Sequence, residues 1–364
     1  MPAPILMAGQ SAARHASPCI PVLPQHVPLA IQTRDGLVES VHYGSLIATA
    51  PAPAGGHTLL AAGDSLAPFY PRSSLKPLQA VAMVRAGLDL PAELLALTAA
   101  SHSGAARHLD GAERILRLHG LTAAVLENST DLPYGVRERE EWLRGGGTPT
   151  RLTQNCSGKH ASMAATCVIN GWPVRGYLYP EHPLQQLVAE TIRELTGEEP
   201  TQTSTDGCGT PLFALTLRGM ARAFGRLAAA TTDSTSGRGG LSEHSPEAAV
   251  AHAMRQHPQM VAGEGRDVTE LMRLMPGLLA KDGFEGVQLV GLPDGRAIAV
   301  KISDGGDRAR MPVTVGVLEA IGVDTAPLAG IASVPVLGGG RAIGLLQAMD
   351  FRSASQTFTS QDQD

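Results

Sequence analysis

Lysine is scarce in this 364-residue chain, because only four of its 29 basic residues are lysines and the other 25 are arginines. Arginine keeps its proton in proteins, whereas a lysine amine can lose it. The remaining lysines are therefore candidates for roles that need a neutral amine, with chance survival in an arginine-rich chain as the alternative. The four are Lys76, Lys159, Lys281 and Lys301.

Other scarce features exclude whole classes of protein. Charged residues make up only 17% of the chain, the net charge is −5, and no Lys/Arg run supplies a basic face, so no nucleic-acid partner is expected. No stretch approaches the roughly 18 apolar residues that span a bilayer, so no membrane partner is expected. The apolar run at residues 3–8 has no Lys or Arg before it, and so lacks the basic region of a secretory signal. Four cysteines are too few for a disulfide scaffold, which favours a cytoplasmic protein.

Strand patterns cluster near the two ends of the chain. They cover residues 28–33, 37–48, 59–62, 286–291, 296–303 and 334–337. Turn signals at residues 34–36 and 293–295 predict two hairpins. Helical periodicity dominates the middle and recurs towards the end, at residues 74–87, 91–100, 106–118, 158–170, 183–195, 211–230, 245–255, 268–275, 311–321 and 343–349.

These patterns predict an α/β protein whose antiparallel sheet is built from both chain ends, with a helical domain inserted between them. Residues 1–25 are expected to form a loose arm and residues 351–364 a disordered tail. Residues 26–350 are expected to form one unit, with a sheet part at about 26–72 and 281–350 and a helical part at about 73–280. Residues 133–149 are charged and glycine-rich, and are expected to form an irregular loop.

Ser73 and Lys76 are spaced as a hydroxyl and an amine on one helix face, within side-chain reach. A serine hydroxyl is a poor nucleophile until a base removes its proton, and an uncharged lysine can be that base. The bland alternative is a capping serine followed by a solvated lysine.

Lys281, Asp282 and Gly283 come just before a predicted strand of the second hairpin. Such a segment can aim a cation at an active serine, although in isolation it reads as a turn. An upstream Ser-x-x-Lys followed by Lys-x-Gly is the order found in penicillin-recognising serine acyl-transferases.

Five segments in this order carry a family resemblance: residues 72–77 (RSSLKP), 100–103 (ASHS), 155–160 (NCSGKH), 205–208 (TDGC) and 257–266 (HPQMVAGEGR). Through them the chain resembles the rhizobial-type L-asparaginases of the asparaginase II family. The fold of that family is similar to that of the serine β-lactamases. The resemblance implies a homodimer that hydrolyses L-asparagine to L-aspartate and ammonia.

The resemblance also implies two Ser–Lys pairs and a metal ion. The nucleophilic pair would be Ser73 with Lys76, and the supporting pair Ser101 with Lys281. One zinc ion per subunit would be held by two cysteines and a lysine, which correspond to Cys156, Cys208 and Lys159. The clearest departure from the family is the segment at residues 209–211 (GTP), which is expected to change the pocket wall.

Three further residues are candidates for binding a zwitterionic amino acid. Arg72 matches a carboxylate with its planar fork, and Asp206, in a glycine-flanked loop, matches an ammonium group. His160 adjoins a motif residue and is expected to line the pocket. For each, the alternative is an ordinary surface or helix-end residue.

Two other functions stay open at the sequence level. One is a β-lactam or D-peptide acyl hydrolase, although such substrates lie outside the cytoplasm and the chain shows no export signal. The other is a non-catalytic protein that binds zinc or asparagine on the same scaffold. Phosphate-loop, dinucleotide-binding and His-Glu-x-x-His motifs are missing from the sequence.

Overall fold

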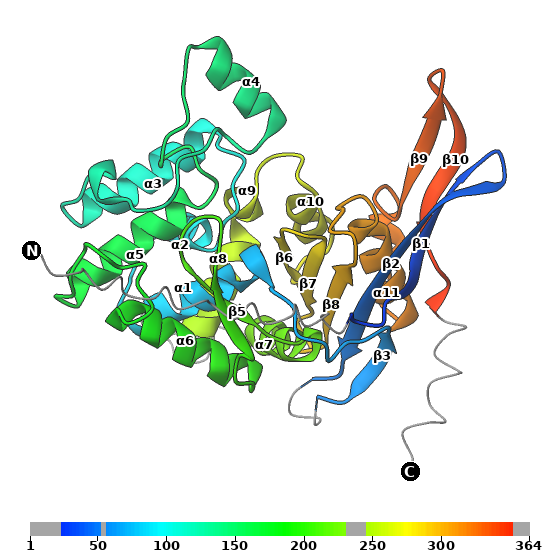
Figure 1. Cartoon of the computed structure of the whole chain (residues 1–364), viewed down its shortest axis with the longest axis horizontal. Helices are drawn as coiled ribbons and strands as arrows, with labels where there is room; N and C mark the ends of the chain where they lie inside the picture. The colour runs from blue at the N-terminus through cyan, green and yellow to red at the C-terminus, as the bar shows by residue number, and fades with distance from the viewer. Residues whose placement is uncertain (1–22, 52–55, 231–244, 352–364) are drawn as a thin grey trace, which may run out of the picture.

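The architecture is an antiparallel sheet shared by the two ends of the chain, as the computed structural model shows for residues 23–51, 56–230 and 245–351 (Figure 1). The strand order is β6-β7-β8-β2-β1-β10-β9, and β3 pairs with β2. Ala30 of β1 lies opposite Ala348 of β10, so the first and the last strand of the sequence are neighbours. The strands of this sheet are β1 (Val27–Arg34), β2 (Leu37–Thr49), β3 (Thr58–Ala62), β6 (Leu279–Gly283), β7 (Val287–Gly291), β8 (Ala297–Ile302), β9 (Ser333–Gly338) and β10 (Arg341–Ala348).

Helices form the part of the molecule beside the β6 edge of the sheet (Figure 1). They are α1 (Lys76–Arg85), α2 (Ala92–Thr98), α3 (Ala106–Leu118), α4 (Val136–Arg144), α5 (Ser157–Ile169), α6 (Pro183–Thr196), α7 (Leu217–Ala229), α8 (Pro246–Gln256), α9 (Pro258–Val261) and α10 (Asp267–Leu274). A short hairpin of β4 (Gln202–Thr205) and β5 (Pro211–Ala214) lies among them. Strand β7 is buried along its whole length, which requires cover on both faces, and α7 and α11 (Arg310–Ala320) both contact β7 and β8.

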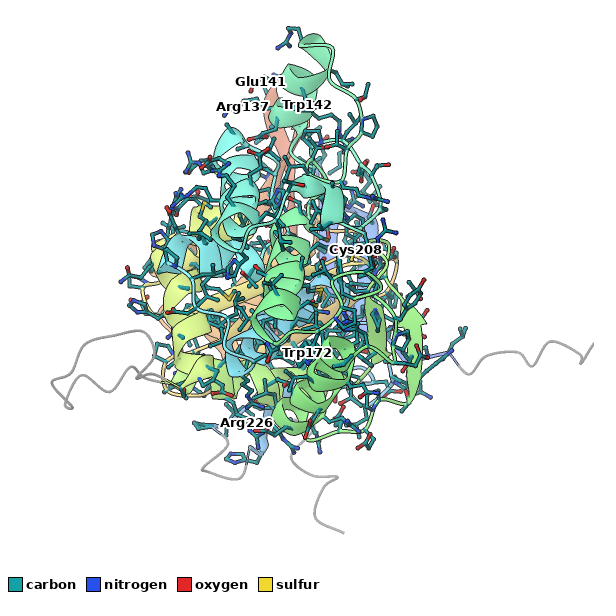
Figure 2. The ribbon with its side chains drawn as sticks, turned by 90° about the vertical axis from the view of Figure 1, so that its left-hand side faces the viewer. Arg137, Glu141, Trp142, Trp172, Cys208 and Arg226 are labelled. Atoms are coloured by element: carbon teal, nitrogen blue, oxygen red, sulfur yellow. The ribbon has the colours of Figure 1, made fainter. Side chains whose placement is uncertain are left out.

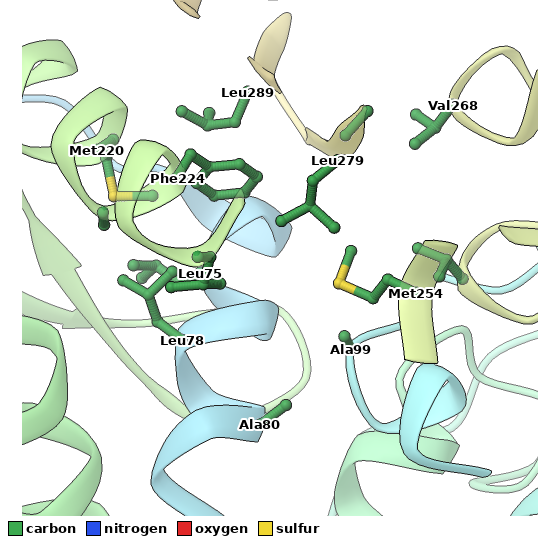
Figure 3. Packing of buried hydrophobic residues seen from close by; sticks show 14 of the residues in the cluster. Leu75, Leu78, Ala80, Ala99, Met220, Phe224, Met254, Val268, Leu279 and Leu289 are labelled. Carbon is green, nitrogen blue, oxygen red and sulfur yellow. The ribbon is translucent and has the colours of Figure 1, made fainter. Parts of the chain in front are cut away.

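A continuous apolar core joins the helices to the sheet. Figure 3 shows Leu75 and Leu78 beside Phe224 of α7, and Leu279 of β6 between Phe224 and Met254 of α8. All five side chains are at most 1% exposed. Since Leu75 precedes Lys76 and Leu279 lies two residues before Lys281, this packing fixes the backbone from which both amines project. It also surrounds them with a medium of low polarity.

The sheet has two strands that the sequence patterns did not predict. Residues 343–349 were expected to be helical, but β10 covers Arg341–Ala348 and pairs with both β1 and β9. The turn before it is made by Gly339 and Gly340, whose φ angles of 56° and 80° suit a tight hairpin and few residues but glycine. The expectation of a turn at Lys281 was also wrong, because Lys281 lies inside β6.

One helical expectation and one loop expectation were also wrong. Residues 211–230 were expected to form one helix, but β5 ends at Ala214 and α7 begins after Thr216, whose hydroxyl accepts the Gly219 N–H at 3.0 Å. The expected loop at 133–149 contains α4, which projects from the body and buries none of its residues. Figure 2 shows its Arg137, Glu141 and Trp142 at one end of the molecule.

The remaining helical predictions and the two hairpins are confirmed within one or two residues at most ends. Residues 352–364 of the predicted tail and residues 1–22 of the predicted arm lie outside the described residues. Phe351, the first residue of the predicted tail, is buried in the core, so the disordered tail does not begin there. Across the described ranges, no helix combines the length and the apolar character needed to cross a membrane.

Candidate active site

A strained turn carries Ser73. The residue lies in the short 3₁₀ helix η2 (Arg72–Leu75), which leads directly into α1. Arg72 has a φ of 53°, a left-handed conformation that costs a non-glycine residue on the order of 1–3 kcal/mol and clusters at functional sites. Gly283 of β6 permits this turn to sit against the sheet, because a Cβ at residue 283 would collide with the Pro71 carbonyl oxygen. The absence of a side chain at Gly283 therefore makes room for the backbone of the turn that carries Ser73.

Ser101 lies between two lysine amines. Lys76 Nζ donates to Ser101 Oγ at 2.9 Å and to the Ala100 carbonyl at 2.6 Å. Lys281 Nζ donates to the same Ser101 Oγ at 3.0 Å. The three side chains are buried, with 1%, 0% and 4% of Lys76, Lys281 and Ser101 exposed. The structure therefore brings the predicted supporting pair together and adds Lys76 to it.

The predicted contact between Ser73 and Lys76 is not made. In the described part of the chain, the Ser73 hydroxyl has no hydrogen bond to either amine, although Ser73 is only 7% exposed. The Lys76 amine turns across to the segment after α2 because a buried amine needs several acceptors, and that segment offers a carbonyl and a hydroxyl. Ser73 remains one helical turn away with an uncommitted hydroxyl.

Burial, together with the nearby positive charges of Lys76 and Arg266, lowers the pKa of Lys281 to about 8. Asp282 acts in the opposite direction, since its Oδ1 lies 2.5 Å from Lys281 Nζ. Burial also opposes the charge of Asp282, but Lys281, Arg266 and Arg310 hold the pKa of that carboxyl well below its usual range. The site thus contains a permanently ionised carboxylate beside an amine that can lose its proton near neutral pH.

The two residues predicted to bind a zwitterion form an ion pair with each other. Arg72 Nε lies 2.8 Å from Asp206 Oδ1, which also accepts the Gly207 N–H at 2.9 Å. The guanidinium also lies over the ring of Phe284, at 5.7 Å. The other oxygen of Asp206, Oδ2, accepts a long hydrogen bond of 3.9 Å from the Cys208 thiol. Asp206 therefore links Arg72 to the cysteine that was predicted to hold a metal ion.

The predicted metal donors lie together in the interior. Lys159 Nζ donates to Cys208 Sγ at 3.2 Å and to Thr210 Oγ1 at 3.0 Å. A hydrogen bond from Cys156, and then the charge of Lys159, lower the pKa of the Cys208 thiol well below its usual range. Thr210 belongs to the divergent segment at residues 209–211, so the departure changes the surroundings of these donors. Cys208 lies well apart from α4 in Figure 2.

His160 lies with these donors and does not line an open pocket. It is fully buried, and its Nδ1 lies 2.9 Å from the Tyr177 hydroxyl. Burial, and then the neighbouring Lys159, lower its pKa to about 4, so the ring is neutral at pH 7. Among the described residues, its Nε2 makes no hydrogen bond of good geometry, although the Cys208 thiol is close enough to act on the pKa of the ring.

The donor set suits a soft ion such as zinc, because thiolates and a neutral nitrogen are the ligands that zinc prefers. Within the described ranges, no three His, Cys, Asp or Glu side chains are grouped so that they could hold a metal ion. A metal ion at Cys156 and Cys208 would need the neutral Lys159 amine as a third ligand. Burial opposes the charge of Lys159, but Cys208 and Cys156 raise its pKa above the ordinary value, so the amine is charged in this arrangement and would have to lose a proton on metal binding.

Several residues of the site have no signal in the spacing of the sequence. Asp282 was seen only as the middle of a turn, and Arg266 only as the end of the segment 257–266. Tyr134 and Phe284 form an edge-to-face pair, with ring centroids 5.9 Å apart, that joins the loop before α4 to the turn after β6. These charges and rings come together at the site only when the chain is folded, so their role cannot be read from the sequence.

Mixed α/β architecture, with buried hydroxyls contacted by amines, is an arrangement suited to a hydrolase. The chain belongs to the L-asparaginase II family, whose model matches residues 30–348. This match confirms the family that the sequence motifs suggested.

Solved structures give weaker likenesses. Mglu in its native form in the presence of 4.3 M NaCl is 15% identical, with a TM-score of 0.31. That match covers 72% of this chain, which spans 56% of the Mglu chain. Mglu in its tris and glutamate form is 18% identical, with a TM-score of 0.30, and covers 77% of this chain and 58% of its own. A search of curated proteins gives no match.

Proposed function

We propose that this protein hydrolyses L-asparagine to L-aspartate and ammonia by Ser–Lys nucleophilic catalysis, on a serine β-lactamase-like fold. The observation that carries the proposal is the Ser101 hydroxyl held at 2.9 Å and 3.0 Å by two buried amines. Such a group can take up and return protons without bulk water. An amine beside a hydroxyl inside an apolar shell has little structural value, since burying it is costly.

Ser73 is the proposed nucleophile, because its hydroxyl makes no hydrogen bond to either amine within the described residues and its turn is strained. Its oxygen attacks the side-chain amide carbon of asparagine. The group formed by Lys76, Ser101 and Lys281 takes up the proton and delivers it to the departing ammonia. Water then hydrolyses the aspartyl ester by the same proton path. The N–H groups at the start of η2 lack helical acceptors and are the proposed oxyanion donors.

Substrate orientation is assigned to Arg72 and Asp206, with the α-carboxylate on the guanidinium and the α-ammonium on the carboxylate. Zinc, at Cys156, Lys159 and Cys208, supplies a rigid wall to the pocket when bound. Asp206 lies two residues before Cys208, so the fixed thiolate also holds the loop that carries this carboxylate. We propose one ion per subunit and a homodimeric assembly, in the cytoplasm.

The direct test measures ammonia release from asparagine and glutamine, and ring opening of a nitrocefin-type β-lactam, by the purified protein. We expect turnover of asparagine in preference to the others. β-Lactam hydrolysis without ammonia release would favour the acyl hydrolase. Tight asparagine binding by calorimetry without turnover would favour a binding protein.

Replacing Asp206 with asparagine is expected to raise KM for asparagine about tenfold or more, because a charge-assisted hydrogen bond contributes about 1.5–3 kcal/mol. Succinamic acid, which is asparagine without its amino group, should be turned over equally by the variant and the parent. The matched control is Asp294→Asn, which breaks an exposed ion pair with Arg296. Equal losses on both substrates would remove Asp206 as the ammonium site.

Replacing Cys208 with alanine, or removing metal with a chelator, is expected to raise KM while most of kcat is retained. The reason is that none of the proposed metal ligands belongs to the proton-transfer group. Zinc content per subunit, measured by elemental analysis beside the kinetics, checks this. A kcat reduced to background in a folded, metal-free protein would place the metal in the chemistry itself.

A further inference from the structure

Arg266 ends the segment 257–266 and precedes α10, and this segment holds the backbone that carries Ser101. The Ser101 N–H donates to the Val261 carbonyl at 2.9 Å, and the Ser103 N–H donates to the Ala262 carbonyl at 2.7 Å. The position of Arg266 is therefore tied to that of Ser101 through a short stretch of paired backbone.

The side chain of Arg266 reaches the other partner of Ser101 through Asp282. Arg266 Nη2 lies 3.0 Å from Asp282 Oδ2, while Asp282 Oδ1 lies 2.5 Å from Lys281 Nζ. The Asp282 carboxylate thus forms ion pairs with two cations, one through each oxygen. The Arg266 guanidinium also lies over the Tyr134 ring at 4.8 Å, which fixes its plane. The Arg266 and Asp282 side chains are only 19% and 12% exposed.

We propose that Arg266 is a positioning residue of the reaction: by holding the outer oxygen of Asp282, it keeps the Lys281 amine on Ser101. This inference rests on the proposed Ser–Lys function. Without Arg266, the carboxylate is free to turn both oxygens towards the amine. The amine is then drawn off Ser101, and its charged form is stabilised.

The sign of the electrostatic effect follows from the groups around Lys281. Its own strand contributes Asp282, α1 contributes Lys76, and the residue before α10 is Arg266. Beyond Asp282, Arg310 of α11 adds a further positive charge. Charged groups on the other elements packed against β6 are bound elsewhere: Arg72 of η2 to Asp206, Glu247 of α8 to Arg85, Arg255 of α8 to the Ala228 carbonyl, and Asp267 of α10 to Arg310.

Removing the positive charge at residue 266 takes away a repulsion on the Lys281 ammonium and leaves Asp282 less neutralised. Both changes raise the pKa of Lys281. A neutral Lys281 then becomes rarer at a given pH, and the acidic limb of the activity profile moves to higher pH. A purely structural arginine has no such signature.

The kinetic test compares Arg266→Met, Arg266→Lys and the control Arg273→Met. Arg273 forms exposed ion pairs with Glu264 and Glu270, and lies on α10. We expect Arg266→Met to lower kcat at pH 7 about tenfold with little change in KM, and to move the acidic limb up by about one pH unit. Arg266→Lys should recover part of both effects, and Arg273→Met should change neither. A lower kcat with an unmoved limb, or a change in KM alone, overturns the proposal.

A second measurement does not depend on catalysis. With only four lysines in the chain, ¹⁵N-lysine labelling gives few amine signals, and Lys281→Met assigns the one of interest. We expect the titration midpoint of that amine to rise in folded Arg266→Met and to stay unchanged in Arg273→Met. An unchanged midpoint in Arg266→Met overturns the inference. Failure of the parent to release ammonia from asparagine overturns the proposed function instead.

Discussion

Ser73→Ala is expected to abolish ammonia release from asparagine, with a loss of about 10³-fold or more. The physical reason is that Ser73 supplies the atom that bonds to the substrate carbon, and no neighbouring group can replace that oxygen. Turnover is measured by a coupled ammonia assay, and folding by circular dichroism and thermal unfolding. The matched control is Ser162→Ala, which removes a buried hydroxyl. Among the described side chains this hydroxyl hydrogen-bonds only Thr98 of α2, so its loss should leave turnover intact.

Ser101→Ala separates the two serines. We expect it to slow the reaction about 10²- to 10⁴-fold, the range for loss of a proton-transfer group, while the acyl intermediate still forms on Ser73. Mass spectrometry of the quenched protein locates that intermediate. An aspartyl ester on Ser101, or near-normal turnover by Ser73→Ala, would falsify the assignment of Ser73 as nucleophile.

Lys281→Met is expected to give the second large effect, a loss of about 10²- to 10⁴-fold in kcat/KM together with the loss of one limb of its pH dependence. The pKa of Lys281 is about 8, so in the parent kcat/KM should rise through that pH as the neutral amine becomes populated. Lys281→Met lacks the titrating amine, so this limb of the pH profile should disappear. If the variant keeps a limb with the same midpoint, the limb in the parent must be due to another group.

The same shift has a consequence for stability that can be measured separately. Because burial lowers the pKa of Lys281 from its ordinary value of 10.5, the unfolded chain holds more protons at this amine between about pH 8 and 10.5. The contribution of Lys281 to the free energy of unfolding therefore rises with pH across this window. Urea titrations at several pH values should show this rise in the parent and lose it in Lys281→Met.

The sequence predicts the helices well because most of them have one apolar face and a terminal signal. It fails at β6, where a lysine, an aspartate and a glycine stand in a strand whose five residues are all buried. Charged residues favour a turn unless other groups offset the free-energy cost of removing them from water. At β6 these groups belong to Arg266 and Ser101. It fails at β10 for a related reason, since the residues 341–348 become a strand by pairing with β1, more than 300 positions earlier.

The residues of the site were predictable from the sequence, but the hydrogen bonds between them were not. The scarcity of lysine identified three amines that are at most 1% exposed, namely Lys76, Lys159 and Lys281. The spacing of Ser73 and Lys76 suggested a local pair, whereas the amine of Lys76 reaches Ser101, which lies 25 residues further along. The contact between Lys281 and Ser101 joins positions 180 residues apart, and no periodicity carries that information.

The pairing of β1 with β10 sets the time at which a newly made chain can become active. Strand β1 has an open hydrogen-bonding edge towards residues 341–348 until those residues have also left the ribosome. Contacts so distant in sequence form slowly, because a long loop must first close at a cost in chain entropy. Nascent chains arrested before residue 283 also lack a complete β6, and with it the second amine. If the proposed function holds, we therefore expect catalysis to begin only after residues 341–348 have emerged and paired with β1, and the unpaired edge is a natural binding site for chaperones in the interval.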